Sequence, residues 1–440
     1  MMLHKDAAKA IIEKISSETK RYATVVISET DSGITRFANS EITQNVSIAD
    51  TSVEVTVYEG KKEATCSTND ISDEGLKVLV KDAEALLTFV PEGEFEPFIM
   101  PQKPVDEVNS DGKLAEAFDV TKRAAMIKEG IEKICDGFTA AGALTLDRLV
   151  FSVGDTRGAF RYTAFDKVSF NTVVTHDDGS AGAGEFCSFT DIPDISAAFD
   201  KANATAAAAR NPISVDLGEY TVVLSPLAFG DLVMFVTYMM GAESVEDGDS
   251  FTIGKMGERL FGENFTIRDD STHPDLLPMR FDHEGNVRKT LDLVGKGVIR
   301  NCLYDNKLAA RHKTENTGHA VSNKGRGGYP LHVIVDGGEQ SVEEIISGVD
   351  SGIYINEFHY TNFVNPRQLQ ITGLTRNGTF LIENGKITKP ITTMRFTINL
   401  LDAFNTITGI SKEKEKINGY YGVSLIPTIK IEDFRFTSKP

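Results

Sequence analysis

Cysteine is scarce in this sequence. The chain of 440 residues contains four cysteines, Cys66, Cys135, Cys187 and Cys302, and they lie far apart. No C-x-x-C pair occurs, so the sequence offers neither a zinc clamp nor a compact disulfide framework. This usage is typical of a protein in a reducing compartment, and we predict a cytoplasmic location.

Long hydrophobic runs are missing as well. The longest apolar stretch, from Leu232 to Met240, is too short to span a bilayer. The N-terminal residues MMLHKDAAKAIIEKI mix charged side chains into the apolar ones, which is unlike the apolar core of a signal peptide. We therefore expect no association with a membrane.

Clusters of basic residues are also absent. The chain has 46 Lys and Arg against 64 Asp and Glu, a formal net charge of −18. A protein that binds duplex nucleic acid directly needs a basic stripe that displaces phosphate counterions. We expect no direct binding to nucleic acid, and we interpret the acidic surface as a source of solubility.

Familiar catalytic motifs are missing too. The stretch from Gly348 to Gly352 reads GVDSG, so its serine is misplaced for a nucleophile elbow. A zinc hydrolase helix needs two histidines one turn apart with a glutamate beside them, but no histidine occurs between His176 and His273. The sequence therefore holds no ready-made metal site or catalytic triad.

One hydrophobic helix stands out, beginning at Pro226 and reading PLAFGDLVMFVTYMM. Its apolar residues Leu232, Phe235, Val236 and Met239 recur at helical spacing, which predicts a buried structural helix. Gly230 and Asp231 are the only residues in it that suggest another role.

Secondary-structure patterns occur twice in the first half of the chain. A helix is predicted from about His4 to Lys20, followed by alternating strands with turns at Asp31-Ser32-Gly33 and Glu59-Gly60, and by a helix from Ile71 to Phe89. A similar order recurs further on, with a helix from about Val120 to Ala141, several strands, and an alanine-rich helix from Ile195 to Arg210. The repeated order suggests a duplicated helix-meander-helix unit.

These patterns predict an α+β fold in two domains. The first, residues 1–215, would pack helices on antiparallel strands, with sub-units 1–90 and 119–210 joined by a proline-rich connector over 91–104. The second, residues 216–440, is predicted to be β-rich. Its strongest signal is the hairpin turn Glu383-Asn384-Gly385-Lys386.

His312, Glu315 and His319 lie at spacings that would bring them loosely to one side of a helix. A free-standing hydrolase could use such a group, with or without a metal ion. Thr317-Gly318 interrupts the helix, however, so a loop without defined ligand geometry is the alternative interpretation.

Several longer stretches resemble one protein family. They read RFANSEITQNVSIADTSVEVTVYEGKKEATCSTN, RFDHEGNVRKTLDLVGKGVIRNCLYDNKLAAR, NTGHA, SGIYI and TRNGTFLIENGKITKP. Together they are similar to the TldD/PmbA proteins, also called modulators of DNA gyrase. The resemblance implies a cytoplasmic metalloprotease that degrades or processes unfolded peptides, including microcin precursors. In that protease a TldD-type subunit carries an H-E-x-x-x-H zinc helix, and a PmbA (TldE) type subunit does not.

This sequence resembles the PmbA side of the family. Where a TldD-type chain would carry its histidines this chain has the Pro226 helix, and INGYYGVSLIPTIKIEDF lacks the late ligand cysteine. The resemblance therefore implies no catalytic or metal-binding residue here and no cofactor in this chain. It also implies a heterodimer with a zinc-bearing TldD-like subunit, with a homodimer as the alternative when the chain is alone.

Five residues are candidates for contact with a peptide or a subunit. His319, within TGHA, resembles the PmbA pattern, which implies a place in a cleft or subunit contact, with burial in a structural loop as an equal alternative. Phe358, Tyr360, Phe363 and Arg367 lie in INEFHYTNFVNPRQLQITG, where an extended peptide could add a strand to a sheet edge. The alternatives are that these aromatic residues belong to the core, and that the chain is a peptide-binding or regulatory protein without a protease partner.

Overall fold

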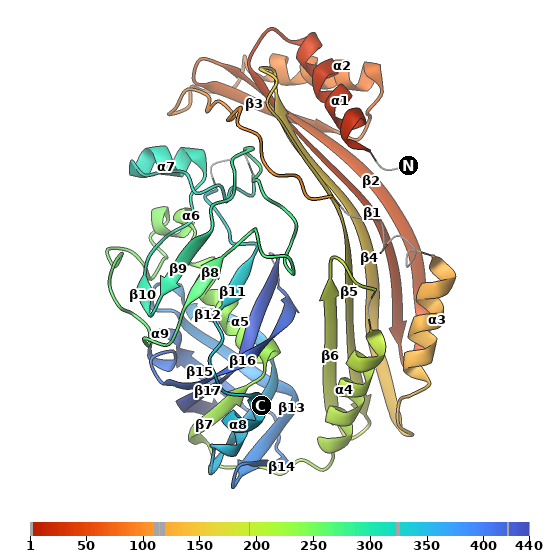
Figure 1. The fold of residues 1–440 in the computed structure, drawn as a ribbon, viewed down its shortest axis with the longest axis vertical. Coiled ribbons are helices and arrows are strands. Elements are labelled where there is room, and N and C mark those ends of the chain that lie inside the picture. The colour runs from red at the N-terminus through yellow and green to blue at the C-terminus, as the bar shows by residue number, and fades with distance from the viewer. Residues whose placement is uncertain are drawn as a thin grey trace.

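The protein is built from two β-sheets, with helices on the outer face of the first (Figure 1). The computed structural model describes residues 3–109, 114, 119–192, 194–322, 326–419 and 422–439. The first sheet is long and curved, and it arches beside the second sheet, which is formed by the C-terminal half of the chain. This arrangement confirms the predicted α+β fold.

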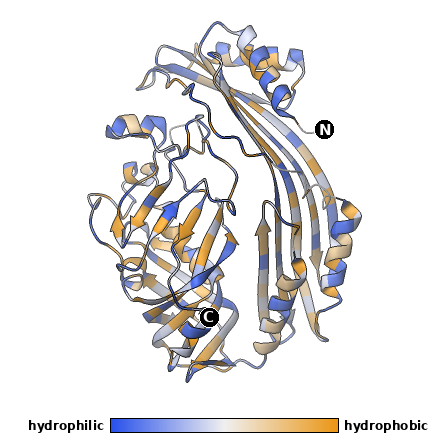
Figure 2. Ribbon diagram, viewed as in Figure 1, coloured by the Kyte–Doolittle hydropathy of each residue, from blue (hydrophilic) through white to orange (hydrophobic). Residues whose placement is uncertain are grey.

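The first sheet has six strands in the order β3-β2-β1-β4-β5-β6, and every neighbouring pair is antiparallel. The strands are β1 (Ala23–Ala38), β2 (Glu41–Glu59), β3 (Lys62–Thr68), β4 (Phe138–Asp155), β5 (Phe160–His176) and β6 (Ala181–Ser188). The helices on this sheet are α1 (Lys5–Glu18), α2 (Asp73–Leu86), α3 (Val120–Ile131) and α4 (Ile195–Ala208). Hydrophobic and hydrophilic residues alternate along the strands, so that each strand presents an apolar side to the helices (Figure 2).

The order helix, three strands, helix occurs twice, as the sequence suggested. The first set is α1-β1-β2-β3-α2 and the second is α3-β4-β5-β6-α4. The two sets join where β1 pairs antiparallel with β4, which is the relation that a local two-fold axis produces. Both sets therefore contribute to one continuous sheet.

The predicted turn at Asp31-Ser32-Gly33 is wrong, because β1 continues straight through it. Gly33 lies opposite Ser47 on β2 and Leu146 on β4, so it is held by pairing on both sides. A Cβ atom at this position would come within 2.4 Å of the Arg123 guanidinium. The glycine therefore makes room for a buried arginine, while the actual turn lies at Asn39 and Ser40, both with positive φ.

The predicted helix from Val120 to Ala141 is too long. Helix α3 ends at Ile131, and β4 begins at Phe138 after Gly137, whose φ is 82°. The segment that follows Gly137 pairs with β5, beginning with Phe138 opposite His176. Pairing in the sheet therefore overrides the local preference of this alanine-containing segment for a helix.

The second sheet has the order β10-β9-β8-β11-β17-β15-β13-β12-β7, with β14 on β13 and β16 on β17. Because β17 also pairs with β7, the strands β7, β12, β13, β15 and β17 form a closed ring. The strands are β7 (Gly218–Leu224), β8 (Ile267–Asp269), β9 (Leu291–Gly295), β10 (Val298–Ile299), β11 (Val333–Val335), β12 (Ser351–Asn365), β13 (Gln370–Glu383), β14 (Lys386–Pro390), β15 (Arg395–Asn399), β16 (Ile407–Asn418) and β17 (Val423–Ser438). The helices of this half are α5 (Pro226–Tyr238), α6 (Ala242–Glu246), α7 (Asn306–His312), α8 (Val342–Ser347), the short 3-10 helix η2 (Pro366–Gln368) and α9 (Leu400–Ala403).

The predicted hairpin in this half is confirmed. Strand β13 ends at Glu383 and β14 begins at Lys386. The two turn residues have positive φ, 50° for Asn384 and 73° for Gly385, as a two-residue turn of the Asn-Gly type requires.

The inner face of the first sheet packs against the C-terminal half of the chain. The Phe151 ring of β4 stacks on Phe281 with ring centroids 5.5 Å apart, and Val153 and Met279 belong to the same buried cluster. The predicted domain boundary at residues 215 and 216 falls between the last helix of the first sheet and β7, and it stays a prediction. In the part of the chain that the structure describes, no helix is long and apolar enough to cross a membrane.

Candidate functional site

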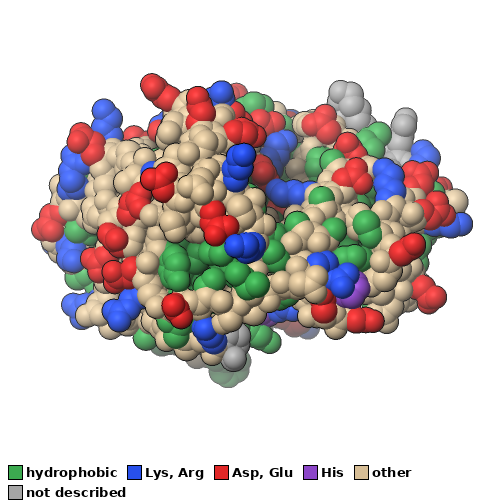
Figure 3. Space-filling view, turned by 90° about the horizontal axis from the view of Figure 1, so that it is seen from below, with side chains coloured by type: hydrophobic (Ala, Val, Ile, Leu, Met, Phe, Trp, Pro, Cys, Tyr) green, Lys and Arg blue, Asp and Glu red, His purple; other side chains and the backbone are tan. Residues whose placement is uncertain are grey.

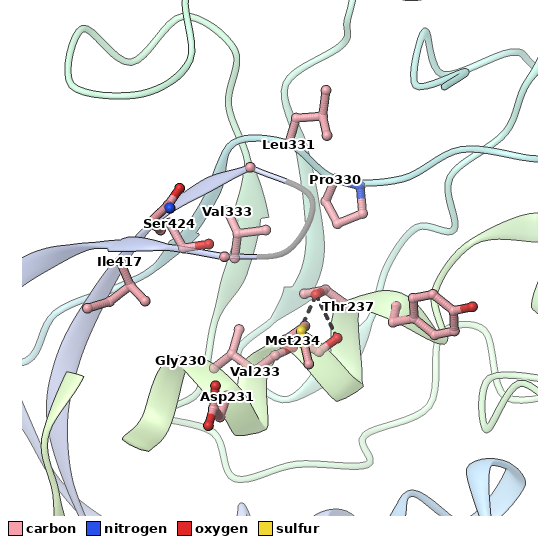
Figure 4. Close-up of a pocket in the computed structure, with 14 residues that line it drawn as sticks. Gly230, Asp231, Val233, Met234, Thr237, Pro330, Leu331, Val333, Ile417 and Ser424 are labelled. Carbon is pink, nitrogen blue, oxygen red and sulfur yellow. Dashed lines mark hydrogen bonds between the residues drawn. The ribbon is translucent and has the colours of Figure 1, made fainter. Parts of the chain in front are cut away.

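A cleft runs along one side of α5 (Figure 4). Its volume is about 360 Å³. Residues from α5, from the segment before β11 and from the facing ends of β16 and β17 form its walls: Gly230, Asp231, Val233, Met234, Thr237, Tyr238, Pro330, Leu331, Val333, Ile417, Asn418, Gly419, Gly422 and Ser424.

Helix α5 is buried on all but one side. Its partly exposed residues include Gly230, Asp231, Met234 and Tyr238, which recur every three or four positions and so form one stripe. All four line the cleft. These are therefore the residues of α5 that can reach a bound molecule.

The position of α5 is fixed at its start. The Ser225 hydroxyl caps the helix by accepting from the Ala228 amide at 3.3 Å, and it also donates to the Asn356 carbonyl of β12. Pro226 occupies the first turn, where its missing N–H costs nothing. The buried Phe229 ring then packs against Phe404 with centroids 5.5 Å apart. The stripe that faces the cleft is thus held on a rigid element.

The cleft offers few groups that could bind a metal ion or perform catalysis. Asp231 is its single carboxylate, and its described lining includes no histidine, cysteine or glutamate. The Thr237 hydroxyl donates to the carbonyls of Val233 and Met234 at 3.1 and 3.2 Å, so it is already used within the helix. Zinc takes three or four nitrogen, sulfur or carboxylate ligands, and across the described ranges no three His, Cys, Asp or Glu residues are grouped to hold a metal. The residues of this cleft do not fit a zinc ion.

Carboxylates with raised pKa values lie around the start of α5. Burial raises the pKa of Asp231 to about 7, and the nearby Glu357 of β12 adds to the effect. Burial likewise raises the pKa of Glu185 on β6 to about 7, although this carboxylate accepts from the Asn418 amide at 3.3 Å. The pKa of Glu357 is raised by burial as well. Like charges in a poorly hydrated region hold protons more tightly, so this region can donate as well as accept hydrogen bonds near neutral pH.

A second group of polar residues is buried where β8 meets β11. Asp269 lies between two histidines, with His319 Nε2 at 3.2 Å and His332 Nδ1 at 3.4 Å from its Oδ1 atom. His319 Nδ1 lies 2.8 Å from the Thr317 carbonyl, so both ring nitrogens face oxygen acceptors. All three side chains are fully buried. The prediction of His319 as a cleft or subunit contact is therefore wrong, and the alternative, burial in a structural loop, describes it.

The pKa values of the charged residues in this cluster are set by one another as well as by burial. Burial by itself would raise the pKa of Asp269, but the hydrogen bonds with His319 and His332 outweigh it and hold the pKa well below its usual value. Burial lowers the pKa of Arg288, which interacts electrostatically with the carboxylates of Asp269 and Asp282. Unlike the residues that line the cleft beside α5, the side chains of Asp269, His319 and His332 are fully buried. We therefore assign this cluster a structural role.

His312, Glu315 and His319 do not come together. The His312 ring, at the end of α7, lies 2.8 Å from Glu246, while Glu315 is exposed and pairs with Lys289 at 2.9 Å. His319 is buried with Asp269, as described above. Helix α7 ends at His312, because Lys313 adopts a left-handed conformation that caps it, and the interpretation of the following residues as a loop describes them.

The four predicted residues of β12 and its turn do not share one surface. Phe358 is 2% exposed and packs against Phe396 in the core, so it is unable to contact a peptide. Phe363 is half-buried and lies edge-on against Phe235 of α5, with centroids 4.7 Å apart. Tyr360 is 70% exposed and Arg367 is exposed as well. Only Tyr360, Arg367 and the outer edge of Phe363 remain candidates for peptide contact.

The buried cluster around Asp269 and the carboxylates with raised pKa values near the start of α5 were not predicted from the sequence. Asp269 is the last residue of β8 and His332 immediately precedes β11, while Glu185 and Glu357 lie on different sheets. No local spacing connects such residues. Asp231, by contrast, could be singled out from the sequence, because a carboxylate in a strongly apolar helix is unusual.

Comparison with known proteins places the chain among metallopeptidase sequences. Residues 217–438 match the profile of the PmbA/TldA metallopeptidase C-terminal domain, and residues 23–87 match that of the PmbA/TldA metallopeptidase domain 1. An uncharacterised protein of Methanocaldococcus jannaschii is 34% identical over 190 residues, which are 42% of this chain and 44% of that protein. The metalloprotease PmbA of Escherichia coli O157:H7 is 26% identical over 195 residues, which are 43% of this chain and 40% of that protein. The chain thus matches a little under half the length of these two relatives.

The fold has a close counterpart among solved structures. TldE from Thermococcus kodakarensis superposes with a TM-score of 0.85, covering 98% of this chain and 100% of that chain at 19% sequence identity. At this level of identity the likeness concerns the fold. The superposition includes both sheets, because it extends over nearly the whole chain.

Proposed function

The chain belongs to the PmbA/TldD metallopeptidase family, and from this premise we propose that it is a PmbA/TldE-like subunit without its own catalytic site, which completes a peptide-binding chamber for a zinc-bearing TldD-type partner. The observation that carries the proposal is the composition of the α5 cleft. The described residues that line this cleft include one carboxylate, but they include no imidazole or thiol. Peptides would then be cleaved on the partner, with this chain shaping the space in which they are held.

The exposed half of β12 supports a role in holding peptides. Strand β7 pairs with β12 only at Ile353, Tyr354 and Ile355, whereas β13 pairs with it as far as Asn365. Within the described residues no strand lies along the β7 side of β12 beyond Asn356. An extended peptide could pair with this free edge through backbone hydrogen bonds, which give affinity with little dependence on sequence.

The proposal can be tested with purified proteins. The chain alone should contain no stoichiometric zinc and should leave an unfolded peptide intact. When a TldD-type protein is added, cleavage should appear, and a chelator should abolish it. Metal analysis together with mass spectrometry of the peptide would measure both results.

The control is the TldD-type protein without this chain, which should cleave much more slowly than the mixture. Chelator-sensitive cleavage by this chain alone would contradict the proposal. Failure of the two proteins to co-purify would favour instead a binding or regulatory protein without a protease partner.

A further inference from the structure

A second cavity lies at the lower end of the molecule, between the two sheets. Its volume is about 410 Å³, and its walls come from the turn between β5 and β6, from the segment after α4, and from β12 and β13. Figure 3 looks onto this lower face, which is hollowed near its middle with hydrophobic and charged side chains around the hollow. A cavity of this size suits a small ligand or the end of a chain.

The chemistry of this lining differs from that of the protein as a whole. The chain carries a net charge of −18, yet the described lining of this cavity contains no aspartate or glutamate. It contains Arg376 and His359 instead, together with hydroxyl groups such as those of Thr175, Ser180 and Thr392. Arginine, histidine and hydroxyl groups are donors, so the cavity presents donors to an anionic ligand.

Arg376 is available for such a ligand. It lies on β13 directly opposite Glu357, and diagonally from His359, whose partner across the strands is Leu374. The Arg376 side chain is exposed, and it interacts electrostatically with the carboxylate of Glu357 across the strands. Glu357 does not line the cavity, and its carboxylate accepts from Asn377 Nδ2 at 2.7 Å.

A bulge in the backbone next to Arg376 allows helix α4, which packs on the first sheet, to approach β13 and form one wall of the cavity. Strand β13 has a bulge at Asn377 and Gly378, where φ is 50° and 114°. A Cβ atom on Gly378 would come within 2.6 Å of Thr205 on α4. The glycine therefore lets α4 approach β13, which brings Ala209 and Ser180 to the cavity wall.

The charge in the cavity matches a monoanion. Burial lowers the pKa of His359, and the neighbouring Arg376 lowers it further, so the imidazole is neutral at pH 7. The cavity then offers one positive charge, which balances a carboxylate and leaves a phosphate dianion partly unpaired. Arginine also binds carboxylates through two parallel hydrogen bonds.

We propose that this cavity binds the terminal carboxylate of a peptide, with Arg376 pairing with the carboxylate and His359 and the surrounding hydroxyls donating hydrogen bonds. The choice of a peptide as ligand rests on the proposed function, whereas the preference for a carboxylate rests on the lining itself. A bound peptide end would lie between α4 and β13 and would join the two sheets.

The experiment is a calorimetric titration of the full chain, without any partner, with two forms of one short unfolded peptide. One form has a free C-terminal carboxylate and the other a C-terminal amide. The free acid should bind at least about ten-fold more tightly, because a hydrogen-bonded charge pair is lost in the amide. In the Arg376→Gln variant this preference should disappear, and in Arg376→Lys it should be partly kept.

Arg435→Gln is the matched control, because Arg435 is also an exposed arginine of the second sheet, on β17, but lies outside the cavity. Its preference for the free acid should equal that of the unchanged chain. Equal binding of both peptide forms, or an unchanged preference in a folded Arg376→Gln variant, would overturn the proposal. Inorganic phosphate that binds more tightly than the free acid would also overturn it. Since no partner protein is present, these results are independent of whether a TldD-type subunit exists.

Discussion

Asp231 is the residue that best describes the α5 cleft, because it is the only carboxylate among the described residues that line the cleft. Its carboxylate lies where a hydrophobic helix meets Glu357 and the end of β6, and burial there raises its pKa to about 7. The folded protein therefore binds this proton more tightly than the unfolded chain does. Stability and protonation are linked at this one position.

Replacing Asp231 with asparagine should change how stability depends on pH. The ordinary pKa of this carboxyl is 3.8 and the folded value is about 7, so its favourable contribution is complete below pH 3.8 and is lost as the pH rises to 7. We expect the unfolding free energy of the unchanged chain to fall over this interval, and to fall less in Asp231→Asn. Urea unfolding at a series of pH values would measure this. Glu258→Gln, at an exposed glutamate, is the control and should leave the slope unchanged; an equal slope in Asp231→Asn would contradict the account.

His319 shows at the same scale how a residue can look functional and be structural. Its ring is fully buried beside an ionised Asp269, and Arg288 is buried nearby. Removal of one member of such a group leaves another buried charge without compensation, which is a large cost to stability. Loss of activity on changing His319 would therefore be expected from misfolding alone.

Among the elements, β1 is the clearest case of a glycine whose role is packing. Gly33 lies beneath the Arg123 guanidinium of α3, and Arg123 in turn donates to Thr35 and to Asn45 on β2, at 3.2 and 3.1 Å. The absence of a side chain at Gly33 thus allows α3 to dock on the sheet.

This packing predicts a coupling between two positions. Gly33→Val should destabilise the protein by about 1–3 kcal/mol, because the new side chain collides with the guanidinium. The same change should cost clearly less in an Arg123→Ala background, which removes the obstacle. A double-mutant cycle by urea unfolding would measure the coupling. Ser47→Val, opposite Gly33 on β2 and exposed, is the matched control and should cost little; the same cost for Gly33→Val in both backgrounds would refute the coupling.

Elements with strong local patterns were predictable from sequence, and those decided by distant contacts were not. Helix α5 and the Asn384-Gly385 turn follow directly from capping, periodicity and turn chemistry. The continuous β1 and the early end of α3 depend on Arg123 and on pairing with β5, which no short window contains. For the site, the apolar helix and Asp231 were visible, but the cleft that they line depends on residues near Leu331 and Ile417.

At the scale of the whole molecule, the contact between the two sheets determines whether the chain behaves as one unit. Phe151 is 7% exposed and stacks on Phe281 of the C-terminal half, with ring centroids 5.5 Å apart. The His283 ring lies tilted against Phe151 at a centroid distance of 4.6 Å. A hydrophobic cluster that includes Val153 and Leu331 surrounds them. Stability of either sheet is thereby tied to the other.

The variant Phe151→Ala should cost about 3 kcal/mol of unfolding free energy, since it leaves a cavity in this shared cluster. Because the cluster joins the first sheet to the C-terminal half of the chain, we expect amide hydrogen exchange to accelerate in β4 and also in the segment around Phe281. Mass spectrometry of exchanged peptides would detect it. Val78→Ala, at an exposed position of α2, is the control and should leave exchange in both places unchanged. Acceleration confined to the first sheet would show that the two sheets open independently.

The closed ring of the second sheet has a consequence for how the chain is made. Strand β7 begins at Gly218, but it finds one of its two neighbours in β17, whose pairing residues extend to Phe436. During synthesis β7 therefore leaves the ribosome before either neighbour, β12 or β17, has been made. The edge that pairs with β17 stays open until more than 200 further residues have been added. Pairings this distant along the chain form slowly, and open strand edges invite aggregation. The C-terminal half must accordingly close after translation has passed β17, which makes this interval the time when the nascent chain most needs a chaperone.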